Sequence, residues 1–213
     1  MQVDRNRFFD PGFRHVFFIS LLLAAMLALS SANYLHAQFL VHPVNLSYLC
    51  RRADIIVQGQ VLTVRHGNLP GYPNIPTVEV TLGIEEMLRG TGGKTYSFRE
   101  VVIGLRPREG KQTYRIGQRL ILFLSSPSRY GLSSPVGIGQ GRFHIANDRS
   151  GKTMVVNERN NAELFENVEQ SARRDGLQFT ERQLQIAATK QGPVALDGFV
   201  SLVKNLTALP RIR

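Results

Sequence analysis

The chain has 213 residues, 43% of them hydrophobic, with no tryptophan and a single cysteine, Cys50. One cysteine excludes an internal disulfide framework, and the lack of tryptophan leaves an aliphatic and phenylalanine-based core. The formal net charge is +10. Such a charge favours anionic partners, because a basic surface concentrates them.

An export signal is indicated at the N-terminus. A basic leader with Arg5, Arg7 and Arg14 precedes a 14-residue apolar run at positions 16–29, which small residues follow. This is the layout of a secretory signal, and the run is shorter than the roughly 20 residues of a spanning helix. We therefore expect residues 1–37 to be a signal peptide or, if uncleaved, an N-terminal membrane anchor. The remainder is expected to be exported, to the periplasm, the cell surface or the extracellular space.

The exported part is expected to open with a short helix at about residues 45–53, with Asn45 as its N-cap. Leu46, Leu49, Cys50 and Ala53 follow the spacing of one helix face. Cys50 is therefore interpreted as a small buried apolar residue rather than a reactive thiol.

Strand-like sequence follows this helix. Residues 54–64 are rich in β-branched side chains and contain Gly59, which indicates a bulge or bend. Residues 66–76 hold two glycines and three prolines and are predicted to be a loop or a wide hairpin connection. Residues 77–85 alternate apolar and polar side chains, the clearest strand pattern in the chain. Residues 94–103 form a further strand, in which a shift of the apolar phase indicates another bulge.

Residues 120–124 (LILFL) predict a strand buried on both faces. A loop at 127–135 follows, and residues 136–146 with 152–156 predict a closing hairpin across 147–151. Five or six short strands at this spacing favour a small barrel or sandwich.

Three segments resemble those of netrin-like modules, the group that includes the tissue inhibitors of metalloproteinases. They are the run from Leu49 to Val61, the Val78-Glu79-Val80 segment leading to Leu88-Arg89-Gly90, and the run from Tyr114 to Leu124. The chain looks most like uncharacterised exported bacterial proteins with this pattern. The resemblance covers roughly residues 46–146 and implies an oligonucleotide/oligosaccharide-binding (OB) barrel. Zinc chelation by an N-terminal cysteine is not carried over, because Cys50 lies inside the exported chain, and no functional residue is transferred.

The expected fold is mainly β: an OB-like (netrin-like) barrel of five or six strands at residues 38–157, with a helical C-terminal extension at 158–213. In the extension, Leu164, Phe165, Val168 and Ala172 form a helical stripe that ends at Gly176. Thr180 and Gln183 resemble a capping box, and a last stripe runs from Leu196 to Leu206. Packing of these stripes against the barrel is favoured over docking of a separate partner.

No catalytic constellation is found in the sequence. Gly151-Lys152-Thr153 lacks the earlier glycine of a phosphate-binding loop, and no two histidines after residue 37 have metal-ligand spacing. Glu85 and Glu86 are adjacent on a strand, so they point to opposite faces. We therefore expect a protein that is not an enzyme and uses no cofactor or metal.

Between Arg89 and Arg129 there are nine Lys and Arg residues against two acidic ones. This basic stretch supplies the candidate anionic-ligand-binding residues: Arg89, Lys94, Arg99, Arg106, Arg108, Lys111, Arg115 and Arg119. The expected function is non-catalytic binding of an anionic polysaccharide or a membrane surface. Few aromatic residues accompany the stretch (Tyr96, Phe98 and Tyr114), which argues against nucleic acid. The alternative is a protein-interaction or protease-inhibitor-like module that acts on an exported partner.

Overall fold

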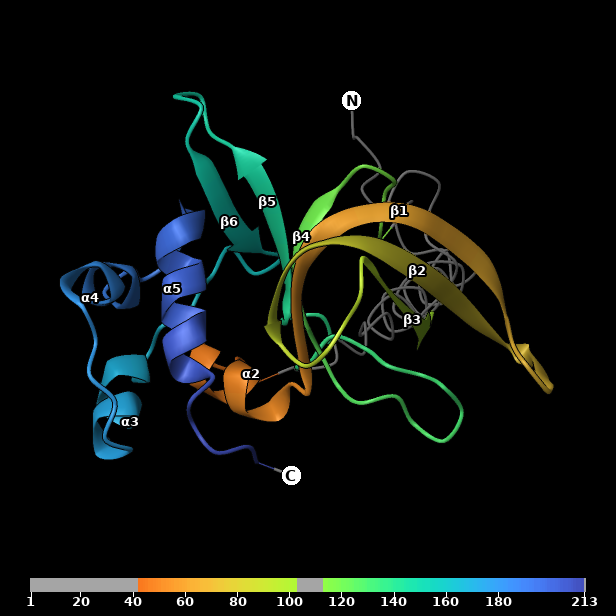
Figure 1. Cartoon of the computed structure of the whole chain (residues 1–213), viewed down its shortest axis with the longest axis horizontal. Helices are drawn as coiled ribbons and strands as arrows, with labels where there is room; N and C mark the ends of the chain where they lie inside the picture. Colours follow the sequence, from red (N-terminus) through yellow and green to blue (C-terminus); the bar gives the residue numbers. More distant parts are fainter. Residues whose placement is uncertain (1–41, 103–112, 213) are drawn as a thin grey trace, which may run out of the picture. The chain divides into compact units, whose positions relative to one another are not determined.

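The computed structural model describes residues 42–102 and 113–212. In this part of the chain the fold is mainly β, a seven-stranded open antiparallel sheet with four helices (Figure 1). The sheet order is β3-β2-β1-β4-β5-β6-β7. The elements are α2 (Leu46–Arg52), β1 (Ile55–Leu69), β2 (Tyr72–Arg89), β3 (Thr95–Val101), β4 (Arg119–Leu124), β5 (Arg142–Asn147), β6 (Thr153–Asn157), α3 (Val168–Arg174), α4 (Glu181–Ala187), β7 (Val194–Ala195) and α5 (Leu196–Leu206).

Strand β4 divides the hydrophobic residues into two cores. Side chains alternate across a strand, so Ile121 and Phe123 face one side of the sheet, while Leu120, Leu122 and Leu124 face the other. All five are completely buried, as the LILFL pattern predicts. We call the first cluster the helix-side core and the second the curled-sheet core. Among the described residues, the buried members of both cores lie between Leu46 and Leu209, so a protein of residues 38–213 contains all of these members.

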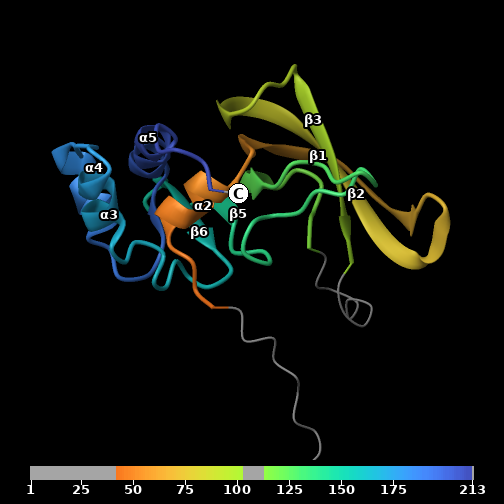
Figure 2. The ribbon, with the colours of Figure 1, turned by 90° about the horizontal axis from the view of Figure 1, so that it is seen from below.

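The curled-sheet core lies on the side of the sheet where β1, β2 and β3 bend over (Figures 1 and 2). The β1–β2 pairing contains four register shifts, one of them between Gln58 and Gly59, where the sequence predicts a bulge. A Cβ at Gly59 would lie only 2.4 Å from the carbonyl oxygen of Gly83, so this position has no room for a side chain. The β2–β3 pairing runs without a register shift, so the bulge predicted in residues 94–103 is wrong.

Residues 66–76, predicted to be a loop or a wide hairpin connection, form a hairpin that is tight rather than wide. Strands β1 and β2 continue through it to a tight turn at Pro70 and Gly71, where Leu69 pairs with Tyr72. Gly71 has a φ of +80°, and proline followed by such a glycine is favoured in a type II turn. Among the described residues, β3 pairs with β2 only from Thr77 onward. The prolines therefore fall where one edge of β2 needs no ladder hydrogen bond.

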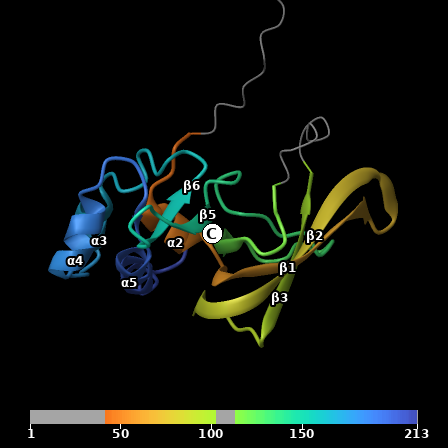
Figure 3. The same ribbon diagram turned by 90° about the horizontal axis from the view of Figure 1, so that it is seen from above.

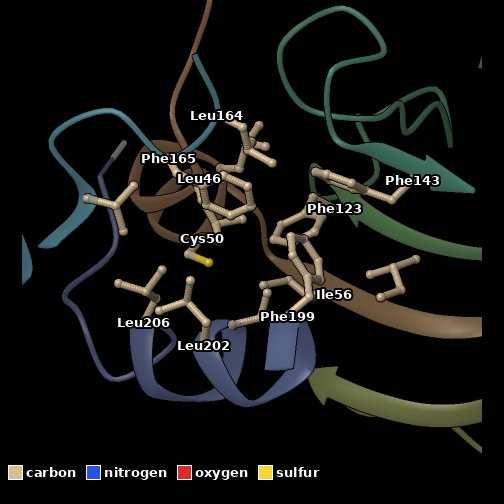
Figure 4. Packing of buried hydrophobic residues seen from close by; sticks show 14 of the residues in the cluster. Leu46, Cys50, Ile56, Phe123, Phe143, Leu164, Phe165, Phe199, Leu202 and Leu206 are labelled. Carbon is tan, nitrogen blue, oxygen red and sulfur yellow. The ribbon is translucent and has the colours of Figure 1, made fainter. Parts of the chain in front are cut away.

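The helix-side core is filled by α2, α5 and the segment before α3 (Figures 3 and 4). The side chain of Cys50 points into this cluster among leucine and phenylalanine side chains (Figure 4). Burial raises the pKa of the Cys50 thiol to about 12, which makes it the inert apolar residue that the sequence indicates. Asn45 caps α2, since its side chain accepts a hydrogen bond from the Tyr48 backbone N–H at 2.9 Å.

The C-terminal helices pack on the sheet, as favoured from their apolar stripes. Phe199, Leu202 and Leu206 of α5 are completely buried in the helix-side core. The capping box of α4 is confirmed, because the side chains of Thr180 and Gln183 bond to each other's backbone N–H. Helix α3 is shorter than its predicted stripe, because Leu164 and Phe165 lie in turns before it and are still buried. β7 pairs with β6, so residues beyond 157 extend the same sheet.

Arg89, at the end of β2, joins two helices to the sheet. Its guanidinium donates to the carbonyl oxygens of Cys50 and Ala53 at the end of α2 and of Thr207 at the end of α5. Carbonyl groups at a helix C-terminus have no partner within the helix and carry its partial negative charge, which a cation stabilises. Arg89 therefore stabilises both helix ends.

We predict that Arg89→Gln lowers the free energy of unfolding of residues 38–213 by about 2–4 kcal/mol, because charged hydrogen bonds to several carbonyls are lost. Urea unfolding followed by circular dichroism measures it. The matched control is Arg149→Gln, at an exposed position in the β5–β6 turn, which we expect to change the value by less than about 0.5 kcal/mol. Equal stability of the two variants would contradict the proposed role of Arg89.

No helix among the described residues is long and apolar enough to span a membrane. The predicted signal or anchor at residues 1–37 lies outside the described ranges.

Candidate functional site

The candidate basic residues have different surroundings in the described part of the chain. Arg89 is engaged by the helix ends, Arg99 pairs with Glu79, and Arg119 donates two hydrogen bonds to Glu85 at 2.7 and 2.6 Å. The Arg119 hydrogen bond lowers the pKa of Glu85, so this carboxylate stays ionised. Lys94 and Arg115 are exposed. Arg106, Arg108 and Lys111 lie outside the described residues.

An exposed aromatic pair lies where two loops meet. Tyr72 begins β2 at the tip of the β1–β2 hairpin, and Tyr130 belongs to the loop between β4 and β5. Their ring centroids are 5.7 Å apart in an edge-to-face arrangement, and each residue is 43% exposed. The guanidinium carbon of Arg129 lies 4.7 Å from the centre of the Tyr130 ring, a cation–π contact. We call Tyr72, Arg129 and Tyr130 the tyrosine platform.

A tight turn holds Arg129 and Tyr130 in place. The Gly131 backbone N–H donates to the Ser128 carbonyl oxygen at 2.8 Å, and Gly131 has a φ of +71°. The Ser128 hydroxyl accepts from the backbone N–H groups of Tyr130 and Leu132 at 3.3 and 3.2 Å. The serine side chain thus stabilises the turn, as Ser often does. The backbone of Arg129 and Tyr130 is therefore held in a fixed geometry.

The same loop is tied to the edge of the sheet. The Ser133 backbone N–H donates to the Arg99 carbonyl oxygen on β3 at 2.8 Å. The Ser133 hydroxyl donates to the Ser125 carbonyl oxygen at 2.6 Å, across the base of the loop. Because β3 is an edge strand, this contact links β3 to the loop after β4 and preorganises the platform from both sides.

A buried polar network connects β3 with β5 on the curled-sheet side. Glu100 lies two residues after Phe98 and so shares its face, and Arg142 pairs with Leu122 and shares the face of that residue. Between them lies Tyr114, whose hydroxyl donates to Glu100 at 3.1 Å. The Arg142 guanidinium lies 5.1 Å from the centre of the Tyr114 ring and pairs with Glu158. Within the described ranges, side chains rather than backbone pairing therefore link β3 to β5.

Burial raises the pKa of Glu100, against the opposing effects of Arg142 and of the Tyr114 hydrogen bond. Burial also raises the pKa of Tyr114. The pKa of His144 is lowered by burial and by Arg142, so this imidazole is neutral at neutral pH, and its Nδ1 lies 2.6 Å from the side-chain nitrogen of Gln118. Tyr114 and Arg142 are 1% and 7% exposed, so the network has little access to a substrate.

Among residues 42–102 and 113–212, no group of three or more His, Cys, Asp or Glu side chains could hold a metal ion. The tyrosine platform consists of residues that the candidate set omits. The sequence carries a weak signal for it, the Ser-Arg-Tyr-Gly turn pattern, but nothing in the pattern links Tyr130 to Tyr72. Comparison of the chain with protein-family models, curated proteins and solved structures found no match.

The raised pKa of Glu100 predicts a pH-dependent stability. A raised pKa means that the folded protein favours the protonated form of the carboxyl group. The contribution of that form to the free energy of unfolding is fully present below the ordinary pKa of 4.5, and it is lost as the pH rises through the folded-state pKa. We expect the free energy of unfolding of Glu100→Gln to exceed that of the wild type near pH 8, because glutamine is neutral like the protonated carboxyl group. The difference should shrink as the pH falls toward 4.5. Urea unfolding at several pH values measures this difference.

The control for this measurement is Glu163→Gln, which removes an exposed carboxylate and should follow the wild-type profile. A difference between Glu100→Gln and the wild type that stays constant with pH would show that ionisation of Glu100 is not penalised by folding.

Proposed function

We propose that the chain is a non-catalytic binding module that holds an extended anionic polysaccharide on the tyrosine platform. The observation that carries the proposal is the exposed contact between Tyr72 and Tyr130 with Arg129 stacked on it. Two large aromatic side chains that remain exposed and are held in place by hydrogen bonds contribute little to a core. Their arrangement fits a role in binding.

The order of the strands in the sheet supports a similarity to the OB fold. β1 pairs with both β2 and β4, and β3 and β5 lie at the two ends of the series β3-β2-β1-β4-β5. Contacts other than a strand pair bridge these ends, namely the Ser133–Arg99 bond and the Glu100–Tyr114–Arg142 network. OB barrels are partly open, and they bind ligands through the loops between strands 1 and 2 and between strands 4 and 5. Tyr72 directly follows the turn between β1 and β2, and Tyr130 lies in the loop between β4 and β5.

The chemistry of the platform favours a sugar polymer with acidic groups. A tyrosine ring has an apolar face for the C–H groups of a sugar and a hydroxyl for hydrogen bonding. Arg129 supplies a charge for a uronate or sulfate group. Because Arg129 covers a face of Tyr130, the pair offers little room for the successive base stacking that single-stranded nucleic acid uses. The proposal includes an exported location, which the signal-like pattern of residues 1–37 supports.

Binding of residues 38–213 to an immobilised polyuronate tests this function. We predict that Tyr72→Ala and Tyr130→Ala each weaken the affinity about fivefold or more, as expected for a central aromatic contact. The matched control is Tyr48→Ala, because Tyr48 is 39% exposed on α2, and it should bind like the wild type. Arg129→Gln should reduce both the affinity and its dependence on salt.

Neutral dextran and a single-stranded oligonucleotide serve as competing ligands. Equal polyuronate binding by the wild type, Tyr72→Ala and Tyr130→Ala would overturn the platform as a site. Tighter binding of the oligonucleotide than of the polyuronate would overturn the ligand class. Absence of binding to any of the three polymers would overturn the function and favour the alternative, a module for an exported protein partner.

A further inference from the structure

A single peptide group of β3 joins the tyrosine platform to the buried polar network. The Arg99 carbonyl oxygen accepts the 2.8 Å hydrogen bond from the Ser133 backbone N–H, and this carbonyl belongs to the peptide group that Arg99 shares with Glu100. Ser133 is 3% exposed, so water has little access to this hydrogen bond. We call residues 125–134 the platform loop, because two of the three platform side chains lie in it. A displacement of Glu100 therefore moves the carbonyl group that holds the platform loop.

The carboxyl group of Glu100 has no ion-pair partner within residues 42–102 and 113–212. It accepts a hydrogen bond from the Tyr114 hydroxyl at 3.1 Å. The guanidinium of Arg142, whose charge acts on Glu100, is paired with the more exposed carboxylate of Glu158. The Nε atom of Arg142 is buried and has no hydrogen-bond partner in the same ranges. Ionisation of Glu100 therefore places a half-buried negative charge beside a cation that is already used elsewhere, which is unfavourable.

The other strands on this face supply no second cation for Glu100. His66 of β1 pairs with Val78 of β2, and Val78 pairs with Glu100, so the three side chains lie in one row on one face. His66 is exposed, two strands away from Glu100. Arg99 and Glu79 point to the opposite face and pair with each other. The side chains that β4 contributes to the curled-sheet face are uncharged: Leu120, Leu122 and Leu124.

On β5, His144 lies two residues after Arg142 and shares its face. Burial and Arg142 lower the pKa of His144, so this imidazole is neutral at neutral pH and does not offset a charge on Glu100. Arg142 is therefore the cation that acts on Glu100, and Glu158 is its competitor for that cation.

We infer that a proton on Glu100 keeps the platform loop attached to β3, so that an alkaline solution loosens the loop and weakens binding at the tyrosine platform. The binding part of this inference rests on the proposed function, whereas the attachment of the loop does not. When Glu100 loses its proton to the solvent, arrangements in which water reaches its carboxylate become more favourable. Such arrangements displace this part of β3 from the network and so weaken the hydrogen bond between Ser133 and Arg99.

The direction of the effect follows from proton linkage. Burial raises the pKa of Glu100 in the closed arrangement, whereas a hydrated carboxyl group has the ordinary pKa of 4.5. The closed arrangement is therefore favoured fully below pH 4.5, and this advantage is lost as the pH rises through the raised pKa. Local openings of a strand end cost less free energy than global unfolding, so this part of β3 responds before the whole fold does.

Hydrogen exchange of the Ser133 amide measures the attachment of the loop without any ligand. The exchange rates of residues 38–213 are measured from about pH 5 to about pH 8 and divided by the rates of an unstructured amide, which removes base catalysis. We expect the protection of Ser133 to fall about fivefold over this range, an ordinary size for coupling between two sites. Glu100→Gln should keep the protection seen at low pH throughout, because glutamine stays neutral.

Polyuronate affinity at constant ionic strength tests the consequence at the platform. The uronate groups stay ionised over this range, because carboxyl groups in water have a pKa of about 4. We expect the wild-type affinity to fall about fivefold as the pH rises and the affinity of Glu100→Gln to stay constant. Glu158→Gln should reduce the fall, because Arg142 can then pair with the ionised Glu100.

Two variants serve as controls. Glu163→Gln removes an exposed carboxylate, and His66→Gln removes the exposed histidine in the row of Glu100; both should keep the wild-type fall. Protection of Ser133 that is independent of pH in the wild type, or that falls equally in Glu100→Gln, would overturn the inference. A flat profile in His66→Gln would overturn Glu100 as the titrating group. Absence of polyuronate binding at every pH would overturn the proposed function, while the protection of Ser133 would still decide whether Glu100 controls the loop.

Discussion

Five consecutive side chains of β4, from Leu120 to Leu124, are completely buried and alternate between the two faces of the sheet. A strand of this kind needs a cover on each side, because each buried leucine or phenylalanine contributes about 1.5–3 kcal/mol only if water is excluded. The helices cover one side, and the curled strands β1, β2 and β3 cover the other. The two cores are therefore joined through β4 and through its neighbour β1.

This division also separates structural roles from exposed ones. On the helix side, Arg89 joins β2 to the ends of α2 and α5, so an arginine from the basic stretch is used to hold the fold together. On the other side, turns connect the strands. Two of these turns expose large side chains, Tyr130 and Ile116, although hydrogen bonds fix their backbones. Rigid exposure of such residues is a property of binding surfaces, since it lowers the entropy lost on binding.

Elements defined by local pattern were predictable from the sequence. The buried strand β4, the N-cap Asn45 and the capping box at Thr180 each depend on neighbours within a few residues. The hairpin at residues 66–76 was expected to be wide, whereas the strands continue to a tight turn, because pairing with β1 overrides the local signals of proline and glycine. The open sheet was not expected either, since whether β3 meets β5 depends on contacts far apart in the chain. The tyrosine platform was missed for the same reason, because Tyr72 and Tyr130 are 58 positions apart in the sequence.

The central claim is that the hairpin tip and the β4–β5 loop act together as a binding face. Hydrogen–deuterium exchange of residues 38–213, with and without a saturating polyuronate, measures this most directly. The account predicts that ligand slows amide exchange together at the tip around Gly71 and Tyr72 and at the turn from Ser128 to Leu132, while α4 and α5 exchange as before. Slower exchange confined to the helices, or to only one of the two loops, would contradict it.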